Sequence, residues 1–269
     1  MTEVPKSATD RTVLATEAYS DDRHLAARQA LYHWQTPRHD LPAIVVDALK
    51  DVQGLVVDVG CGNGKFLKKL AEERPDLQLL GLDIAPGILA QIPTATAIAD
   101  AHRLPLADNS ASAVLLAHML YHVEDIHQAL AEARRVLKPS GLVIASTNSA
   151  TDKAELDDLW SLAAGDVLGV ERGPRRVSLS SRFTLEDAPK FLGAHFTDIK
   201  TIELPGVIRV EDPAPVVAHM ASYRAWAAEY GVPFDATIAR ARARLTAGIV
   251  EQGFYDIGCL GGILIGRNP

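Results

Sequence analysis

The sequence predicts an α/β fold with a mostly parallel sheet, and two observations carry this prediction. From residue 55 onward, short apolar runs alternate with segments of helical composition, a pattern that βαβ crossovers produce. The first of these runs, residues 55–57, leads through Asp58 into a turn with three glycines and then into the helix-forming stretch FLKKLAEE. A β-branched run, a glycine-rich turn and a helix start form a strand–loop–helix unit. A chain of 269 residues can bury a large core around such units.

The remaining elements follow in order, and no internal repeat interrupts them. We expect residues 1–15 to be disordered or loosely attached, and residues 16–49 to form two or three helices broken at Pro37 and Pro42. Asp125 is a typical N-cap for a helix that runs through Leu137. Further strands are expected at 77–84, 95–100, 112–119, 142–147, 196–204 and 258–267, and further helices at 87–92, 151–169, after Thr184, 214–230 and 234–252.

Composition narrows the class of function. Hydrophobic residues make up 48% of the chain and the net charge is −7, which argues against broad binding to a phosphate backbone. Two arginine clusters, 172–176 and 240–244, are interpreted as solvated faces. The two cysteines, Cys61 and Cys259, provide neither a disulfide framework nor a zinc pattern. No apolar signal core or membrane-length stretch is evident, so we expect a cytoplasmic protein.

The glycine turn predicts a ligand site. Gly60, Gly62 and Gly64 let the backbone approach a ligand closely, and the helix start presents unpaired N–H groups. The dinucleotide fingerprint would need its last glycine where Lys65 stands. Asp58 would oppose a pyrophosphate but suits a ligand with a cationic end, such as a sulfonium or an ammonium.

This turn closely resembles motif I of the class I S-adenosylmethionine-dependent methyltransferases. The stretch GLDIAPGIL resembles the acidic second motif of that family. HRLPLADNSASAVLLAHMLYHVED, followed by EARRVLKPSGLVIAS, resembles its later signatures. The likeness covers about residues 50–147 and is greatest to small-molecule enzymes of the ubiquinone/menaquinone-biosynthesis type.

The resemblance implies a Rossmann-like, seven-stranded sheet with an antiparallel C-terminal edge. Residues 1–49 would then be an N-terminal tail and helical cap. Residues 50–269 would be the methyltransferase core, with a helical insertion at about 205–256. S-adenosylmethionine would be the methyl donor and S-adenosylhomocysteine the product.

Donor contacts are implied residue by residue. Asp83 ends the second strand, where an acid accepts hydrogen bonds from ribose hydroxyls, and Ile84 would pack on the adenine. Asp100 or the amides after it would meet the adenine edge, while Tyr19 and Arg28 would hold the methionine end. The implied donor-binding set is Tyr19, Arg28, Asp58, Gly60, Cys61, Gly62, Gly64, Asp83, Ile84, Asp100, Ala101, His102 and His118.

Methyl transfer from a sulfonium is a displacement at carbon, so alignment of the reactants and exclusion of water dominate the catalysis. A general base adds about 10²–10⁴-fold where the acceptor is protonated. His122 or His118 is the candidate base, with Tyr121 as an orienting hydroxyl, although a histidine here could equally be a loop or donor contact. A metal site at these histidines is not expected, because the predicted strand end and loop disrupt the ligand spacing.

The sequence favours a small molecule or short peptide-like metabolite as methyl acceptor, with no membrane partner and nucleic acid disfavoured. An rRNA or tRNA base methyltransferase and a non-catalytic S-adenosylmethionine-binding scaffold stay open as alternatives. Met220, Tyr223, Trp226 and Tyr230 recur every three to four residues, which mostly indicates core packing and leaves one or two of them for the substrate pocket. The sequence does not decide the methylated atom or the oligomeric state.

Overall fold

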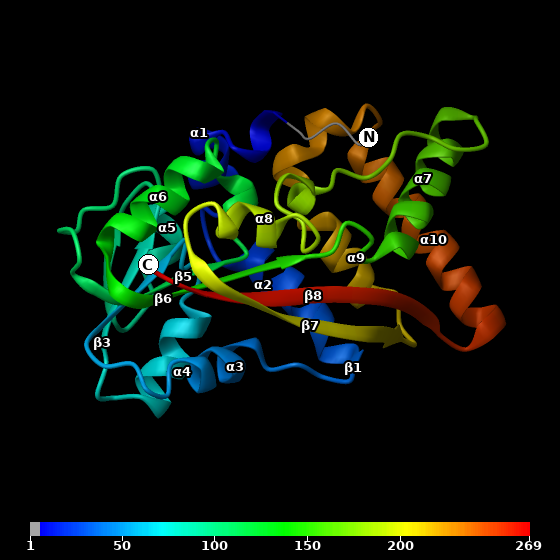
Figure 1. Ribbon diagram of the computed structural model, residues 1–269. Coiled ribbons are helices and arrows are strands. Elements are labelled where there is room, and N and C mark those ends of the chain that lie inside the picture. The colour runs from blue at the N-terminus through cyan, green and yellow to red at the C-terminus, as the bar shows by residue number, and fades with distance from the viewer. Residues whose placement is uncertain (1–5) are drawn as a thin grey trace.

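The computed structural model describes residues 6–269 and contains one eight-stranded sheet in the order β1-β7-β8-β6-β5-β2-β3-β4 (Figure 1). Strands β2 to β6 pair in parallel, whereas β8 pairs antiparallel with both β6 and β7. The strands are β1 (Gln35–Thr36), β2 (Leu55–Val59), β3 (Gln78–Asp83), β4 (Ala95–Ile98), β5 (Ala111–Ala117), β6 (Leu137–Asn148), β7 (Thr197–Val210) and β8 (Tyr255–Arg267). The mostly parallel sheet with an antiparallel C-terminal edge is thus confirmed.

The strand count differs from the seven predicted, because β1 adds an eighth strand at the edge. Its two residues pair antiparallel with Val207 and Ile208 of β7. A strand of two residues shows no alternation of apolar and polar positions, so periodicity could not reveal it. Gln35 of this strand is buried beside Gly206, where a Cβ would come within 2.5 Å of the Gln35 side chain. The close approach explains why β7 carries a glycine at this position.

Helices cover both faces of the sheet, α3 and α4 on one side and α6 and α8 on the other (Figure 1). The helices are α1 (Arg11–Val13), α2 (Arg23–Ala30), α3 (Leu41–Ala48), α4 (Lys65–Glu73), α5 (Pro86–Leu89), α6 (Ile126–Val136), α7 (Ala154–Leu168), α8 (Ala188–Gly193), α9 (Ala214–Ala221) and α10 (Phe234–Gln252). Shorter turns are η1 (Lys6–Ala8), η2 (Leu14–Ala18), η3 (Leu31–Trp34), η4 (Leu120–His122), η5 (Leu179–Arg182) and η6 (Arg224–Tyr230). No helix among those described is long and apolar enough to cross a bilayer.

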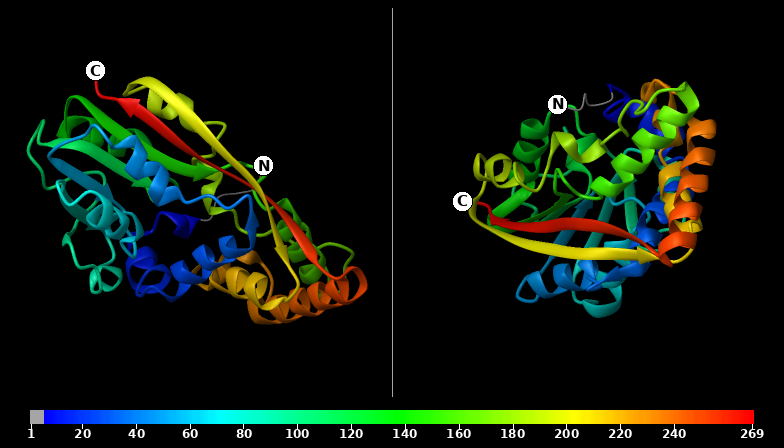
Figure 2. Two further views of the ribbon diagram at one scale, coloured as in Figure 1. Left: turned by 90° about the horizontal axis from the view of Figure 1, so that it is seen from below. Right: turned by 90° about the vertical axis from the view of Figure 1, so that its right-hand side faces the viewer.

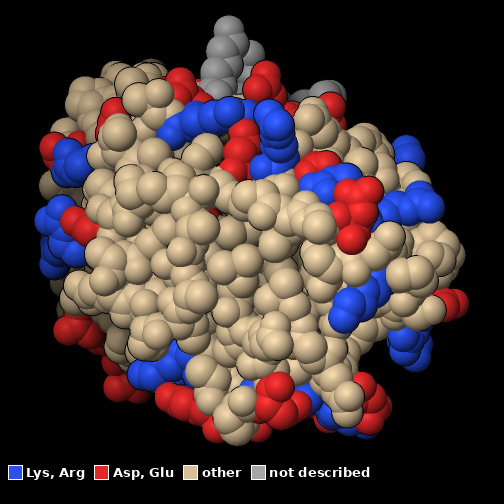
Figure 3. All heavy atoms as spheres, turned by 90° about the vertical axis from the view of Figure 1, so that its left-hand side faces the viewer, with Lys and Arg blue, Asp and Glu red and all other residues tan. Residues whose placement is uncertain are grey.

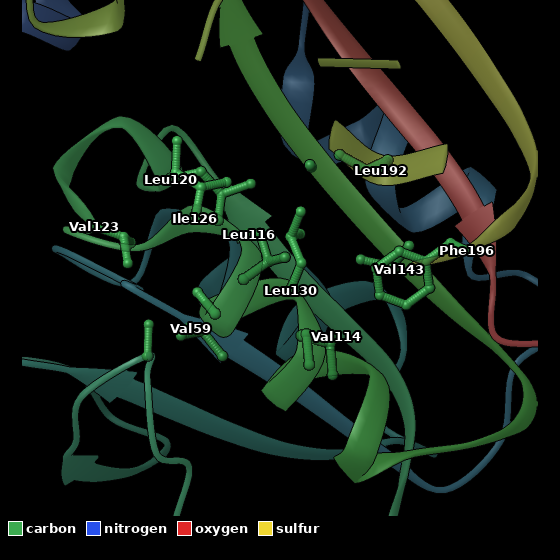
Figure 4. Packing of buried hydrophobic residues seen from close by; sticks show 14 of the residues in the cluster. Val59, Val114, Leu116, Leu120, Val123, Ile126, Leu130, Val143, Leu192 and Phe196 are labelled. Atoms are coloured by element: carbon green, nitrogen blue, oxygen red, sulfur yellow. The ribbon is translucent and has the colours of Figure 1, made fainter. Parts of the chain in front are cut away.

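Helix α6 shows why the sequence folds this way locally. The Asp125 side chain accepts a hydrogen bond from the Gln128 amide at 3.0 Å and so caps the helix N-terminus. Apolar residues at helical spacing then face the sheet, and their side chains are buried: Ile126, Ala129, Leu130, Ala133 and Val136. They pack with Val114, Leu116 and Val143 of the central strands (Figure 4). This cluster fixes the carboxyl ends of β2 and β5, where the site forms.

A second layer, which we call the helical cover, lies over the carboxyl ends of β3 and β5. It consists of residues 6–34, α7 and the segment from α9 to α10, and Figure 2 shows these helices along one side of the molecule. One apolar cluster joins Leu14, Trp160 and Trp226 of the three parts. Ile84 and Tyr121, which follow β3 and β5, pack against the same cluster. The cover therefore closes over the edge of the sheet at which parallel strands end.

Two expectations about segment boundaries need correction. Residues 6–15 are not loosely attached, because Ala8 and Leu14 are buried in the cover; residues 1–5 lie outside the described part. Strand β7 continues through Pro205 to Val210, so the helices between β7 and β8 span 214–252 rather than about 205–256. A proline is tolerated there because Pro205 itself is paired only with Leu260 of β8, whereas the pairing with β1 is at Val207 and Ile208.

Candidate active site

A cavity lies between the carboxyl ends of the central strands and the helical cover. Residues 59–63, 65–66, 83–84 and 99–102 contribute one part of its lining, which we call the glycine-turn wall. The other part, the Arg176 wall, comes from residues that are distant in sequence: Tyr32, Tyr121, Asn148, Ser149, Asp152, Lys153, Asp157, Arg176, Ser178, Leu179, Ser180, His219 and Tyr223. The three candidate catalytic residues, His118, Tyr121 and His122, all line this cavity.

Backbone geometry shapes the glycine-turn wall. Gly60 has a φ of 68°, and a Cβ at this position would come within 2.7 Å of Met119 Cβ. The amides of Gly60 and Cys61 both donate to the Leu82 carbonyl, at 2.7 and 3.0 Å. These bonds tie the turn to β3 and leave the following amides directed at the end of that strand. Only glycine combines this backbone conformation with so close an approach.

Asp83 completes this wall. Its carboxylate accepts hydrogen bonds from the Gly62 and Ala85 amides, both at 2.9 Å. Burial raises the pKa of Asp83, and the amide hydrogen bonds oppose that rise. A carboxylate has about four acceptor positions, so these two bonds leave capacity for hydroxyl donors from the cavity. The residues present therefore fit a ligand that offers a pair of neighbouring hydroxyls.

Asp100 lies in the same wall but is already engaged. Its Oδ1 accepts from the His102 amide at 2.9 Å and contacts the His102 ring at 2.7 Å, and its Oδ2 forms an ion pair with Arg11. Burial raises the pKa of Asp100, but the His102 hydrogen bonds and the Arg11 charge bring it below its usual value. Arg11 thus links the N-terminal segment of the cover to this wall.

His122 has both ring nitrogens occupied. Nδ1 lies 2.9 Å from the Ala8 carbonyl and must donate to it, so Nε2 accepts from the Tyr19 hydroxyl at 2.7 Å. The ring stacks on Trp226 at 6.0 Å between centroids. Burial lowers the pKa of His122 to about 4. The imidazole is neutral at pH 7, and it can accept a proton from a substrate only after Tyr19 releases Nε2.

His118 is the less committed imidazole. It follows β5 with a φ of 54° and makes no side-chain hydrogen bond with residues 6–269. Burial, with the neighbouring Lys153 and Lys65 charges, lowers its pKa to about 4. A neutral ring that lines the cavity without a protein partner is available to a bound molecule. Within the described residues, no group of three or more candidate ligands could hold a metal ion.

Two residues of the predicted donor-binding set do not line the cavity. Asp58 is fully buried, and neither of its carboxylate oxygens has a hydrogen-bond partner among the residues described. Side chains alternate along a strand, which places Asp58 on the Val56 face, behind the turn. Burial and the Asp83 charge raise the pKa of Asp58 to about 8. Gly64 forms the N-cap of α4 with a φ of 72° and also lies outside the lining. The remaining predicted donor residues all line the cavity.

The interpretation of the first arginine cluster as a solvated face is wrong for Arg176. Its side chain is 8% exposed, its Nε donates to Asp157 at 2.8 Å, and its guanidinium lies 5.5 Å from the centre of the Tyr223 ring. Arg172 and Arg175 are exposed, as are the arginines of the second cluster. Nothing in the local sequence separates Arg176 from its neighbours, because the difference arises from packing against α7 and α9.

Lys153 was likewise missed by the sequence. It is 3% exposed, donates to the Tyr32 hydroxyl at 2.6 Å and pairs with Asp152. Burial lowers the pKa of Lys153, but the Asp152 and Tyr32 interactions more than offset this and raise it above its usual value. Tyr32 and Lys153 lie 121 positions apart in the sequence, so no spacing rule could join them.

Residues 57–145 match a family described as "Methyltransferase domain". This segment contains the glycine turn, Asp83 and strands β3 to β5, in the strand order described above. Residues 57–145 are a class I methyltransferase domain. This domain supplies the glycine-turn wall of the cavity, whereas the Arg176 wall comes largely from residues outside the domain.

Relatives of known name match over part of the chain. A malonyl-[acyl-carrier protein] O-methyltransferase of Hahella chejuensis is 31% identical over 112 residues, which cover 39% of this chain and 40% of the relative. A ubiquinone/menaquinone biosynthesis C-methyltransferase of Desulfotalea psychrophila is 34% identical over 95 residues, 33% of this chain and 39% of the relative. The chain thus spans about 40% of the length of these curated relatives.

Solved structures resemble the fold over more of the chain. An S-adenosylmethionine-dependent methyltransferase of Thermotoga maritima aligns with a TM-score of 0.51 at 16% identity and covers 96% of this chain and 99% of its own. A candidate methyltransferase from an antibiotic biosynthesis pathway of Anabaena variabilis aligns with a TM-score of 0.56 at 16% identity, covering 82% and 96%. At such identities the likeness establishes the fold of the methyltransferase domain and its surroundings.

Proposed function

We propose that the chain is an S-adenosylmethionine-dependent methyltransferase that acts on a small molecule enclosed in the cavity. The observation that carries this proposal is the junction of the glycine turn and Asp83 at one wall of the cavity. The Gly62 amide bonds the Asp83 carboxylate there, inside a methyltransferase domain. The helical cover supports a small acceptor, because its residues line the same cavity.

Asp83 would hold the ribose hydroxyls of the donor, with Ile84 and the Ala101 amide toward the adenine. Arg28 suits the methionine carboxylate, because its Nη2 is buried with no acceptor among residues 6–269. The guanidinium lies 5.1 Å from the centre of the Tyr19 ring, and Nη1 donates to the Ser222 carbonyl at 3.1 Å. A buried donor without a partner costs free energy, which a ligand carboxylate would recover.

When bound, S-adenosylmethionine supplies both the methyl group and its leaving group. The chain then has to align the acceptor and exclude water, and such positioning can contribute roughly 7–11 kcal/mol to lowering the barrier. The cover places Leu14, Tyr19 and Tyr223 along the cavity, which keeps water away from a sulfonium. We assign the role of base, where one is needed, to His118 before His122, because the two nitrogens of His122 are already bonded.

Nucleic acid is a poor fit as the acceptor. The net charge is −7, and the face shown in Figure 3 carries basic and acidic side chains intermixed around an uncharged area. Neither of the named relatives described above is named for RNA. A basic surface track of the kind that binds a phosphate backbone is absent from the face in view.

Calorimetric titration with S-adenosylmethionine and S-adenosylhomocysteine tests the donor site. Asp83→Ala removes the proposed ribose acceptor, and hydrogen bonds to a charged group are worth about 1.5–3 kcal/mol, so we expect at least a tenfold loss of affinity. Asp51→Ala, at an exposed carboxylate, is the matched control and should bind both ligands as the wild type does. Failure of the wild type to bind either ligand would sink the proposal. Tight binding without transfer of a labelled methyl group to any small molecule would favour a scaffold instead.

A further inference from the structure

The Arg176 guanidinium carries unused hydrogen-bond capacity inside the cavity. Its Nε is bonded to Asp157, and the Tyr223 ring lies 5.5 Å from the guanidinium. The two terminal nitrogens have no acceptor among the residues that the structure describes. A guanidinium offers five N–H donors in a planar fork that matches a carboxylate in a bidentate manner. Arg176 is 8% exposed and lines the cavity, so this fork is directed at a bound molecule rather than at bulk water.

The same Tyr223 ring also lies close to Arg28, whose guanidinium is 5.6 Å from its centre. Two arginines therefore share one aromatic side chain in the wall of one cavity. Under the proposed function, Arg28 binds the methionine carboxylate of the donor. Arg176 is then left for a second ligand group, which belongs to the acceptor.

His219 adds an independent observation beside Arg176. This α9 side chain is 3% exposed and lines the cavity, yet neither ring nitrogen has a partner within residues 6–269. Burial and the charges of Lys153, Arg176 and Arg28 push its pKa well below its ordinary value, although the Arg28 backbone acts in the opposite direction. The ring is therefore neutral and carries one N–H donor that no protein group uses. An unpaired polar group in so buried a position indicates a ligand atom next to it.

We propose that Arg176 and His219 bind the carboxylate of the methyl acceptor, which is a carboxylic acid with an aromatic or apolar body. This inference rests on the proposed function. Tyr32, Tyr121 and Leu179 supply the aromatic and apolar lining of the same wall. The other charges favour a monoanion: Arg176 already pairs with Asp157, and Lys153 pairs with Asp152. A doubly charged phosphate would enter this wall without compensating charge, which is costly in a buried site.

The test is calorimetric titration. The protein is first saturated with S-adenosylhomocysteine, and phenylacetate or its uncharged analogue phenylacetamide is then titrated into it. Because bound S-adenosylhomocysteine already occupies Arg28 with its methionine-derived carboxylate, the titration reports on carboxylate binding at Arg176. We expect phenylacetate to bind at least tenfold more tightly than phenylacetamide. Arg176→Gln should weaken phenylacetate binding at least tenfold, whereas Arg175→Gln, at the exposed neighbour, should change it less than twofold.

Three results would overturn the inference: no phenylacetate binding, equal binding of the acid and the amide, or tighter binding of phenyl phosphate than of phenylacetate. Arg176→Lys keeps the charge without the fork, so an intermediate loss is expected from a variant that retains the Asp157 pair. If Arg176→Gln fails to fold, the lysine variant decides, and unchanged phenylacetate affinity in it would count against the fork. S-adenosylhomocysteine affinity, measured first on every variant, separates a failure of this inference from a failure of the proposed function.

Discussion

One buried aspartate lies behind the glycine-turn wall and another lies in the Arg176 wall, and the two are stabilised in opposite ways. Asp58, behind the glycine-turn wall, is fully buried without a partner among the described residues, and its raised pKa keeps it protonated at neutral pH. Asp152, in the Arg176 wall, forms an ion pair with Lys153, and the two side chains are 7% and 3% exposed. Backbone amides hold the first wall together, and side-chain ion pairs hold the second. We therefore expect the two walls to respond differently to substitution and to pH.

The largest effect should follow from breaking the buried pair. Asp152→Ala leaves Lys153 charged, 3% exposed and bonded only to Tyr32, so we expect a loss of about 3–5 kcal/mol in the free energy of unfolding. Urea denaturation measures it. The double variant Asp152→Ala/Lys153→Met should recover most of the loss, because no charge is then stranded.

The matched control for that prediction is Asp256→Ala, which breaks the exposed pair with Arg209. Exposed pairs contribute about 0–1 kcal/mol. Equal losses in Asp152→Ala and Asp256→Ala would contradict the view that the Arg176 wall depends on a buried ion pair.

The next largest effect concerns pH. The folded protein keeps the Asp58 proton up to about pH 8, whereas the unfolded chain releases it near pH 4. Asp58 therefore contributes stability that is fully present at low pH and is lost as the pH rises from the unfolded pKa through the folded pKa of about 8. Asp58→Asn has no proton to lose. Between pH 5 and 7, the stability of the wild type relative to this variant should therefore fall by about 1.4 kcal/mol per pH unit. Asp108→Asn, at an exposed carboxylate, should leave the slope unchanged.

A smaller effect is expected from the glycine turn. Gly60→Ala combines a positive φ with a Cβ only 2.7 Å from Met119, and we expect a cost of roughly 1–3 kcal/mol together with a clear loss of S-adenosylhomocysteine affinity. Gly253→Ala has a φ of 85° but open space around the new Cβ, so it reports the backbone strain alone. Thermal melts and calorimetry compare the two. A Gly60→Ala protein that binds the product normally would show that the turn does not contact the donor.

The same contrast explains what the sequence could predict. Gly62 lies in the turn after β2 and Asp83 ends the neighbouring strand β3, 21 positions later, and a spacing rule joins them. The motif gives the position of Asp58 in the chain but not that it lies outside the cavity lining, because the pleat of β2 decides which face it occupies. Arg176 and His219 come from segments without a motif, and only the packing of the cover brings them to one cavity. The sequence was sufficient for the parallel sheet but not for the wall that would select the acceptor.

The smallest expected effect lies where the helical cover contacts the η4 turn after β5, at the Tyr19–His122 hydrogen bond. Tyr19→Phe removes the hydroxyl that occupies Nε2 but keeps the ring beside Arg28, so we expect a loss of only about 0.5–1.5 kcal/mol in stability. Without this donor the neutral form of His122 is less favoured, and its pKa should rise from about 4 toward its ordinary value, as an NMR titration would show. If His122 is the base, this variant should retain methyl transfer and His122→Gln should abolish it. If His118 is the base, His118→Gln should cause the larger loss, and an unchanged rate in that variant would leave alignment of the reactants as the main source of catalysis.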